Sequence, residues 1–301
     1  MAIANRPSKI TLPQENKGWK NIAEFLIERF PLIEKSIWLS RLNLGKVHWQ
    51  NGDRVDLNTA FVANRTLCYY REVEKELEVP FEHNIIHQDQ HILVTCKPHF
   101  LPVTPGGQAV NECLLERLRQ EQDLEDIVAM HRLDRETAGL VIFSINAKTR
   151  GTYCQLFADR KITKCYQAVA QLPETINSLA LPQKWSITNR LQKSKPAFIM
   201  HEVDGDINAH SEISLVDKNN QLGLFDLKPI TGKTHQLRLH MSKIGTPILN
   251  DKFYPKLLPE KPENFEQPLQ LLAKSLSFID PISGIQHHYN SQRKLSEWIK
   301  N

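Results

Sequence analysis

MHRLDRETAGLVIFS, residues 130–144, is a polar half followed by an apolar half. The run LVIF at 140–143 contains no polar residue, which is typical of a strand buried on both faces. Asp134 lies ahead of this run, two residues after Arg132 and directly before Arg135. Because loops at strand ends often carry chemistry, the segment predicts both a central strand and a candidate site residue.

Two interpretations of Asp134 follow from its charged neighbours. Nearby guanidinium groups favour the ionised form of a carboxylate, which suits a nucleophile or a base. The same charges could instead form a surface salt-bridge network that only holds the loop in place. Spacing alone favours the second interpretation.

Helical and strand patterns alternate irregularly in the rest of the chain. Apolar runs predict further strands at 92–96, 166–170 and 222–227, and helical spacing predicts helices at 110–118, 146–160 and 234–244. Because strict alternation of strand and helix is missing, we expect an α+β fold with a mixed, mainly antiparallel sheet.

Three further motifs accompany HRLDRETAGL at 131–140. PITGKTHQLRLH at 229–240 leads into GTPIL at 245–249, KCYQA lies at 164–168, and KP at 97–98 follows a predicted strand. Together these motifs closely resemble the RluA family of pseudouridine synthases. The resemblance runs from about residue 84 to 290. It implies the pseudouridine synthase fold and the isomerisation of a uridine in ribosomal or transfer RNA.

The resemblance also implies roles for individual residues. Asp134 is the expected catalytic carboxylate, Tyr166 is expected against the target uracil, and Arg238 is expected to pair with Asp134. An arginine keeps a carboxylate ionised at neutral pH, and the uracil must leave its stack to be reached. The carboxylate could add to the sugar, add to the base, or remove a ribose proton to give a glycal. The reaction neither oxidises nor hydrolyses, so no cofactor is expected.

Four residues of the catalytic domain are the expected RNA contacts. Arg132 is expected to enter the RNA stack as the target base leaves it, and Lys164, Lys233 and Gln236 complete the set. His131 is predicted to pack or to anchor the loop. Lys233 stands where arginine is common in the family, and Asn250-Asp251 replaces the usual Gly-Asp.

The first 75 residues are expected to be a separate basic module. They hold 12 Lys and Arg against 8 Asp and Glu, whereas the other 226 residues balance at 26 against 26. Helical spacing predicts two helices that end at Pro31 and Gly45, and Asn51-Gly52 predicts a hairpin turn. We therefore expect two domains, residues 1–75 and 76–301.

This N-terminal module loosely resembles the small RNA-binding domain named after a ribosomal small-subunit protein. Arg41, Lys46 and Arg54 are its expected RNA-binding residues. A basic module on a neutral body suits a polyanionic partner such as RNA. The alternative is a helical cap that only covers the main domain.

Composition excludes several classes of protein. The 301 residues are 41% hydrophobic and 24% charged, which is typical of a globular chain. No window approaches the ~18 apolar residues of a membrane span, and the first 20 residues lack the apolar core of a signal peptide. We therefore expect a cytoplasmic protein without membrane contact. Five cysteines without a CxxC pair predict reduced, packing thiols.

Two competing functions remain to be weighed against a monomeric RNA isomerase. A non-catalytic RNA-binding or RNA-chaperone protein on the same fold would need no aspartate facing a phosphate chain. A metal-dependent hydrolase lacks a ligand set, because the helical interpretation of His83, His87 and His91 is interrupted by a strand. We therefore expect no metal site.

Overall fold

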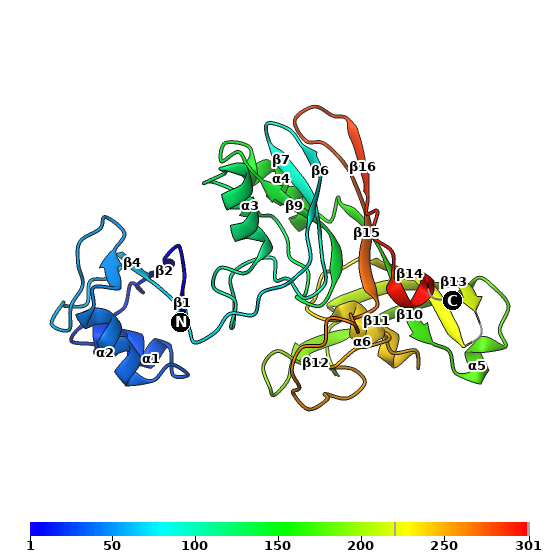
Figure 1. Cartoon of the computed structure of the whole chain (residues 1–301), viewed down its shortest axis with the longest axis horizontal. Coiled ribbons are helices and arrows are strands. Elements are labelled where there is room, and N and C mark those ends of the chain that lie inside the picture. Colours follow the sequence, from blue (N-terminus) through cyan, green and yellow to red (C-terminus); the bar gives the residue numbers. More distant parts are fainter. Residues whose placement is uncertain (220, 300–301) are drawn as a thin grey trace. The chain divides into compact units, whose positions relative to one another are not determined.

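The computed structural model describes residues 1–219 and 221–299, which form two compact units (Figure 1). The first unit comprises residues 1–77 together with 106–111, and the second contains the rest of the described chain. Residues 106–111 thus belong with the N-terminal unit although they are distant from it in sequence.

The first unit packs two helices against a small antiparallel sheet. The helices are α1 (Ile22–Arg29) and α2 (Lys35–Asn43). The sheet has the order β2 (Ser8–Thr11), β4 (Thr66–Tyr69), β3 (Val47–Trp49), and a second pair joins β1 (Ala2–Ile3) to β5 (Glu72–Val73). Large aromatic side chains, among them Trp19, Trp38 and Trp49, fill the core between these elements.

Arg41 does not lie on an RNA-facing surface of this unit, so the sequence-based expectation is wrong for this residue. It is 5% exposed, its guanidinium lies 4.9 Å from the ring of Trp38, and its Nε lies 3.7 Å from Glu72. The cause is helical periodicity, because Trp38, Arg41 and Leu42 fall on one face of α2 and all three are buried.

The second unit is built on one large mixed sheet. Its strands follow the order β12 (Met200–Val203), β11 (Gln183–Lys193), β13 (Ala209–Asn219), β14 (Leu222–Pro229), β10 (Thr163–Gln171), β15 (Leu271–Ile279), β9 (Ala138–Ser144), β7 (Ile92–Lys97) and β6 (Asn84–Gln88). In addition, β16 (Gln286–Asn290) pairs with β15, and β8 (Val128–Ala129) pairs with β9. The pair β15–β9 is parallel, and every other described pair is antiparallel. The expected α+β fold is confirmed.

Five helices accompany this sheet within the described residues. They are α3 (Leu114–Gln122), α4 (Arg150–Ala158), α5 (Glu174–Asn177), α6 (Gln236–Lys243) and α7 (Ser296–Ile299). The three longer helices that the sequence predicts each begin two to four residues later than expected. For α6 the reason is His235, which adopts φ 51° immediately before the helix and cannot continue it backwards.

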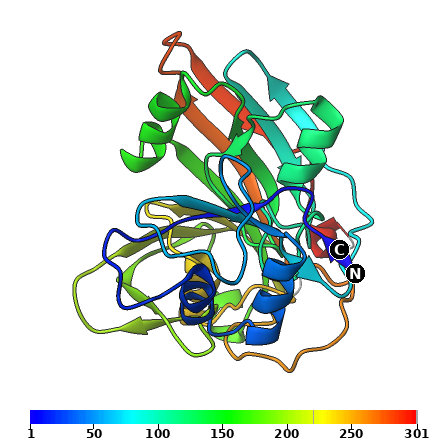
Figure 2. The same cartoon turned by 90° about the vertical axis from the view of Figure 1, so that its left-hand side faces the viewer.

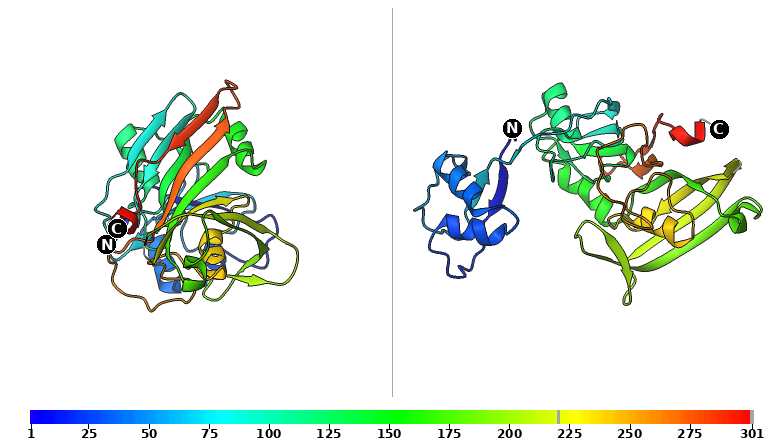
Figure 3. Two further views of the ribbon diagram at one scale, coloured as in Figure 1. Left: turned by 90° about the vertical axis from the view of Figure 1, so that its right-hand side faces the viewer. Right: turned by 60° about the horizontal axis from the view of Figure 1, so that its bottom comes forward.

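Helices cover both faces of the strands that follow the Asp134 segment. Val141 and Phe143 of β9 pack in a cluster with Leu118 of α3, whereas Ile142 packs with Tyr153 of α4. Figure 2 shows the two helices on opposite sides of these strands. Burial on both faces explains why the run at 140–143 is continuously apolar rather than alternating. Another helix, α6, packs through Leu237 and Met241 against β13 and β14 (Figure 3).

Strand β15 brings the two chemically important parts of the sheet together. Ala273 pairs with Tyr166 of β10 on one edge and with Gly139 of β9 on the other. Gly139 has φ +119°, and a Cβ added there would lie 2.6 Å from the backbone nitrogen of Ala273. Only glycine fits this close approach of the two paired strands. Gly139 therefore fixes the start of β9, five residues after Asp134.

We predict that Gly139→Ala lowers the free energy of unfolding by about 2–4 kcal/mol, because it adds both a backbone clash and a strained positive φ. Chemical denaturation measures this change. Gly151→Ala is the matched control, since Gly151 lies in α4 with open space around its Cβ position, and it should leave stability equal or up to about 1 kcal/mol higher. Equal stability of the two variants would contradict the assigned role of Gly139.

Candidate active site

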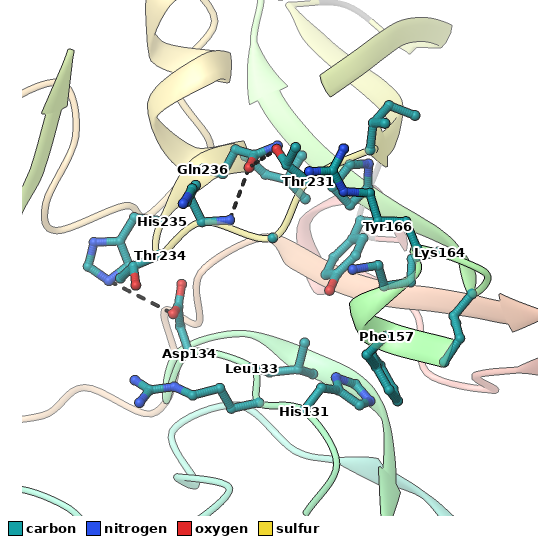
Figure 4. Close-up of a pocket in the computed structure, with 18 of the residues that line it drawn as sticks. His131, Leu133, Asp134, Phe157, Lys164, Tyr166, Thr231, Thr234, His235 and Gln236 are labelled. Atoms are coloured by element: carbon teal, nitrogen blue, oxygen red, sulfur yellow. Dashed lines mark hydrogen bonds and ion pairs between the residues drawn. The ribbon is translucent and has the colours of Figure 1, made fainter. Parts of the chain in front are cut away.

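A cleft of about 730 Å³ opens where the three longest motifs meet. Its lining comes from residues 130–134, from 156–166 at the end of α4 and the start of β10, and from 229–238 around the start of α6. Figure 4 shows Asp134, Tyr166 and Thr231 approaching the cleft from these different elements. The fold therefore gathers into one cavity the segments that the sequence analysis selected separately.

Asp134 lies beside a deeply buried arginine. Its side chain is 20% exposed, and its Oδ2 atom lies 3.7 Å from Nη1 of Arg238, which is 1% exposed. The expected pair therefore exists, but it is a long ion pair rather than a hydrogen bond. Glu136 Oε2 lies at the same distance of 3.7 Å from Nη1, so one guanidinium nitrogen faces two carboxylates.

The closest partner of Arg238 is Asp251, to which the sequence analysis assigned no role. Arg238 donates from Nε to Asp251 Oδ2 at 2.8 Å and from Nη2 to Oδ1 at 2.6 Å. This two-pronged contact fixes the plane of the guanidinium. The remaining nitrogen, Nη1, has no hydrogen-bond partner among the described residues and faces Asp134. Asp251 thus aims Arg238 at the candidate catalytic group.

The electrostatic setting keeps the charges of this cluster in place. Burial opposes the charge of Arg238, but hydrogen bonds and charge from Asp251, with further charge from Asp134 and Glu136, raise its pKa. Burial also opposes the charge of Glu136, and the neighbouring Arg135 and Arg238 lower its pKa overall. Burial, followed by the charge of Asp134, raises the pKa of Tyr166, so its phenol is neutral at physiological pH.

Comparisons with known proteins identify the family of the chain. The sequence model of the RNA pseudouridylate synthase family matches residues 91–243. The dual-specificity RNA pseudouridine synthase RluA of Pasteurella multocida is 32% identical over 209 residues, which cover 66% of this chain and 88% of the relative. The chain belongs to this family. An uncharacterized RNA pseudouridine synthase of Synechocystis is 28% identical over 240 residues, covering 77% of this chain and 78% of the relative.

Solved structures agree on the fold of this RluA-type RNA pseudouridine synthase. Human RNA pseudouridylate synthase domain containing 1 superposes with a TM-score of 0.57 at 18% identity, covering 75% of this chain and 96% of that one. Human RNA pseudouridylate synthase domain containing 4 superposes with a TM-score of 0.53 at 23% identity, covering 72% of this chain and 90% of that one. Family membership makes the protein an isomerase acting on RNA, rather than the non-catalytic RNA-binding protein considered as an alternative.

Among the described residues of the synthase, no helix has the length and apolarity to cross a membrane. The same part of the chain contains no group of three or more His, Cys, Asp and Glu side chains that could hold a metal ion.

His235 is a further polar residue of the site that sequence reasoning missed. Its Nε2 atom lies 3.9 Å from Asp134 Oδ1, as the dashed line in Figure 4 marks, and its Nδ1 atom lies 3.1 Å from the hydroxyl of Tyr254. Burial is the main cause that lowers its pKa, so the ring is neutral at physiological pH. The signal available in the sequence was its place inside the 229–240 motif. Sequence alone does not show the αL backbone of His235, which directs its ring toward Asp134.

All four expected RNA-binding residues of the catalytic domain line the cleft, and three of them are positively charged. Arg132 and Lys233 are exposed, and Lys164 is half-buried, where burial lowers its pKa. The charges of Arg132 and Lys233 are thus more exposed than the carboxylate of Asp134, whose side chain is 20% exposed. This distribution suits contacts with a phosphate backbone.

Gln236 has a different role from the expected RNA contact. It is 3% exposed, and its amide donates to His210 O and Ser211 Oγ at 2.9 and 2.8 Å. Its oxygen accepts from Thr231 Oγ1 at 2.7 Å and from the Lys233 N–H at 3.0 Å. All four hydrogen-bonding positions of the amide are thus used internally. Gln236 shapes the 231–233 turn that carries Lys233.

Two side chains, Lys97 and His131, hold the loop around Asp134. Lys97 is fully buried and donates from Nζ to the carbonyl oxygens of Pro98, Leu101 and Arg135 at 2.9, 2.6 and 3.1 Å. His131 accepts the Ile142 N–H at 3.1 Å. The ring of His131 also stacks on Phe157 at 4.8 Å. The predicted anchoring role of His131 is confirmed.

The other two expected RNA-binding residues of the first unit differ in their contacts. Lys46 is partly buried and forms an ion pair with Glu72. Arg54 is exposed and donates from Nη2 to the Asn43 carbonyl at 2.9 Å, which leaves part of its guanidinium facing solvent. Arg54 is therefore the stronger candidate for a phosphate contact within this unit.

We predict that the stability contribution of Lys97 rises with pH. Burial lowers its pKa to about 7, against the opposing charges of Glu136 and Asp134. Between about pH 7 and 10.5 the unfolded chain holds a proton that the folded protein has released, so the free energy of unfolding rises with pH. The difference between wild type and Lys97→Met should therefore increase across this range, by at most about 1.4 kcal/mol per pH unit.

Chemical denaturation at several pH values measures this difference. Lys148→Met, which removes an exposed lysine, is the control and should show no such slope. A flat or falling difference for Lys97→Met would refute the depressed pKa.

Proposed function

We propose that this RNA pseudouridine synthase isomerises a specific uridine in structured ribosomal or transfer RNA, with Asp134 as the catalytic carboxylate. The observation that carries the proposal is a partly exposed carboxylate on a cleft of nucleotide size, 3.7 Å from a guanidinium that is 1% exposed. A purely RNA-binding surface gains nothing from a carboxylate there, because a carboxylate repels the phosphate backbone.

The chemistry explains why an ionised carboxylate is useful. The bond from uracil N1 to ribose C1′ breaks, the base turns, and a bond from C5 to C1′ forms. The C5 proton leaves and N1 gains a proton, so the reaction needs neither an oxidant nor a reductant. Asp134 can add to the sugar, add to the base, or remove a ribose proton, and each route requires its charged form.

Other residues of the cleft take supporting roles in this proposal. Tyr166 offers a neutral aromatic ring on which the flipped uracil stacks, and its raised pKa supports that state. Arg238 places a positive charge 3.7 Å from Asp134. Arg132, Lys164 and Lys233 contact the RNA around the target nucleotide, with Arg132 entering the stack that the base leaves.

We predict that Asp134→Asn lowers the rate of isomerisation by at least about a thousandfold, because the amide keeps the shape of the carboxylate and loses its charge. RNA affinity and the unfolding transition should stay within error of wild type. Release of tritium from RNA labelled at uridine C5 measures the reaction directly, since the C5 proton leaves in every route.

Asp126→Asn, a change at an exposed aspartate, is the control and should be fully active. Turnover by Asp134→Asn at the control rate would remove Asp134 from the catalytic role. The target is found by mapping pseudouridine in cells that lack the protein and are rescued with wild type or Asp134→Asn. A site restored only by wild type identifies both the RNA and the reaction.

The N-terminal module, residues 1–75, is proposed to bind the RNA backbone. Support comes from its net charge of +4 and from the exposed guanidinium of Arg54. We predict that Arg54→Gln raises the Kd for RNA several-fold and makes the slope of log K against log salt less steep by about 1. Binding titrations at four salt concentrations measure both, and an unchanged slope would leave this module as a structural cap.

A further inference from the structure

Glu263 links two positively charged side chains beside the candidate active site. Its Oε2 atom accepts from Arg135 Nη2 at 2.6 Å, and its Oε1 atom accepts from Lys252 Nζ at 2.6 Å. The Glu263 side chain is 10% exposed, so its charge is largely removed from water. A carboxylate in such a position is stable only while its partners hold it.

Both partners of Glu263 are chain neighbours of groups already placed in the site. Arg135 directly follows Asp134, and Lys252 directly follows Asp251, which binds Arg238. Arg238 in turn faces Asp134. Charges therefore alternate around a closed ring, joined by four ion pairs and two peptide bonds: Asp134, Arg135, Glu263, Lys252, Asp251 and Arg238.

The segment that carries Glu263 is anchored independently of these charges. Phe265 packs edge-on against Phe100 and Phe81, with ring centroids 5.1 and 5.7 Å apart. Glu263 also lies outside residues 91–243, the part of the chain that the family model matches. The ring is thus completed by a segment that the family motifs do not contain.

We propose that Glu263 is a positioning residue for Asp134, which rests on the catalytic role proposed above. Glu263 draws the side chain of Arg135 away from Asp134 and fixes the peptide between them. The ion pair of Glu263 with Lys252 also restrains the neighbouring Asp251, which positions the Arg238 guanidinium. The position of the Asp134 carboxylate is therefore held through Arg135, and the position of the Arg238 guanidinium is held through Asp251.

Loss of the Glu263 charge changes the balance around Arg135. The guanidinium of Arg135 then keeps Glu136 as a partner, whose Oε1 accepts from its Nε at 3.1 Å. Freed from Glu263, it can turn toward Asp134 and compete with Arg238. The expected defect lies in the chemical step, because no RNA-facing group of the cleft is removed.

The test compares Glu263→Gln with Glu266→Gln, which removes an exposed charge three residues along the same segment. Single-turnover rates at saturating RNA, the KM and the Kd for RNA are measured for both. We expect Glu263→Gln to react about tenfold more slowly with KM and Kd unchanged. Glu263→Asp, which keeps the charge, should recover part of the rate, and Glu266→Gln should match wild type.

A double-mutant cycle with Arg135→Gln shows whether Glu263 acts through Arg135. We expect the double variant to be no slower than Arg135→Gln alone. Multiplied rate losses would overturn the proposal, because the two residues would then act separately. If Glu263→Gln does not fold, Lys252→Gln replaces it, since Lys252 is 40% exposed and its loss breaks the same ring.

Failure of this inference differs from failure of the proposed function. An inactive Asp134→Asn with a fully active Glu263→Gln, or a fully active Lys252→Gln used in its place, overturns the positioning role and leaves catalysis by Asp134 intact. An active Asp134→Asn overturns both. A slower Glu263→Gln with a raised KM assigns it to RNA binding and overturns its positioning role.

Discussion

The buried pair between Arg238 and Asp251 is the interaction on which the site depends. A guanidinium that is 1% exposed must be paired, because an unpaired charge in the interior costs several kcal/mol. Asp251 meets this requirement with two hydrogen bonds and leaves Nη1 directed at Asp134 and Glu136. The ring of Phe253, 4.5 Å from the guanidinium, covers it further. Burial and pairing together make the position of this positive charge independent of solvent.

Much of the fold could be predicted from local sequence patterns. The continuous apolar run at 140–143 indicated a strand covered on both faces, and α3 and α4 provide that cover. The burial of Arg41 could also have been predicted, since it lies three residues after Trp38 on the same helical face. The internal hydrogen bonds of Gln236 were harder to predict, because its partners His210 and Ser211 belong to a strand more than 20 residues away.

The motifs could identify the reaction but not the supporting contacts of the site. Asp134, Tyr166 and Arg238 lie in motifs whose residues share one cleft, so a resemblance selected them together. Asp251 keeps the aspartate of the family's usual Gly-Asp pair, but that pair does not reveal its partner Arg238, and no local pattern marks Glu263. The role of each becomes recognisable only when the fold brings it to a cation of another segment, as with Glu263 and Arg135, which are 128 residues apart. Ion pairs between distant segments depend on the folded chain and cannot be predicted from the spacing of residues along the sequence.

The pairing of Gly139 and Tyr166 with opposite edges of Ala273 limits which parts of this enzyme can change. Hydrogen-bonded strands keep a spacing of about 4.8 Å, so the reacting loop and the aromatic ring are held two strands, or about 10 Å, apart at their backbones. That separation is invariant as long as the sheet is intact. Exposed side chains of the cleft that are proposed to contact RNA, such as Arg132 and Lys233, are under no such constraint. On that proposal, substitutions at these exposed positions can change the RNA preference while the spacing of the two strands stays the same.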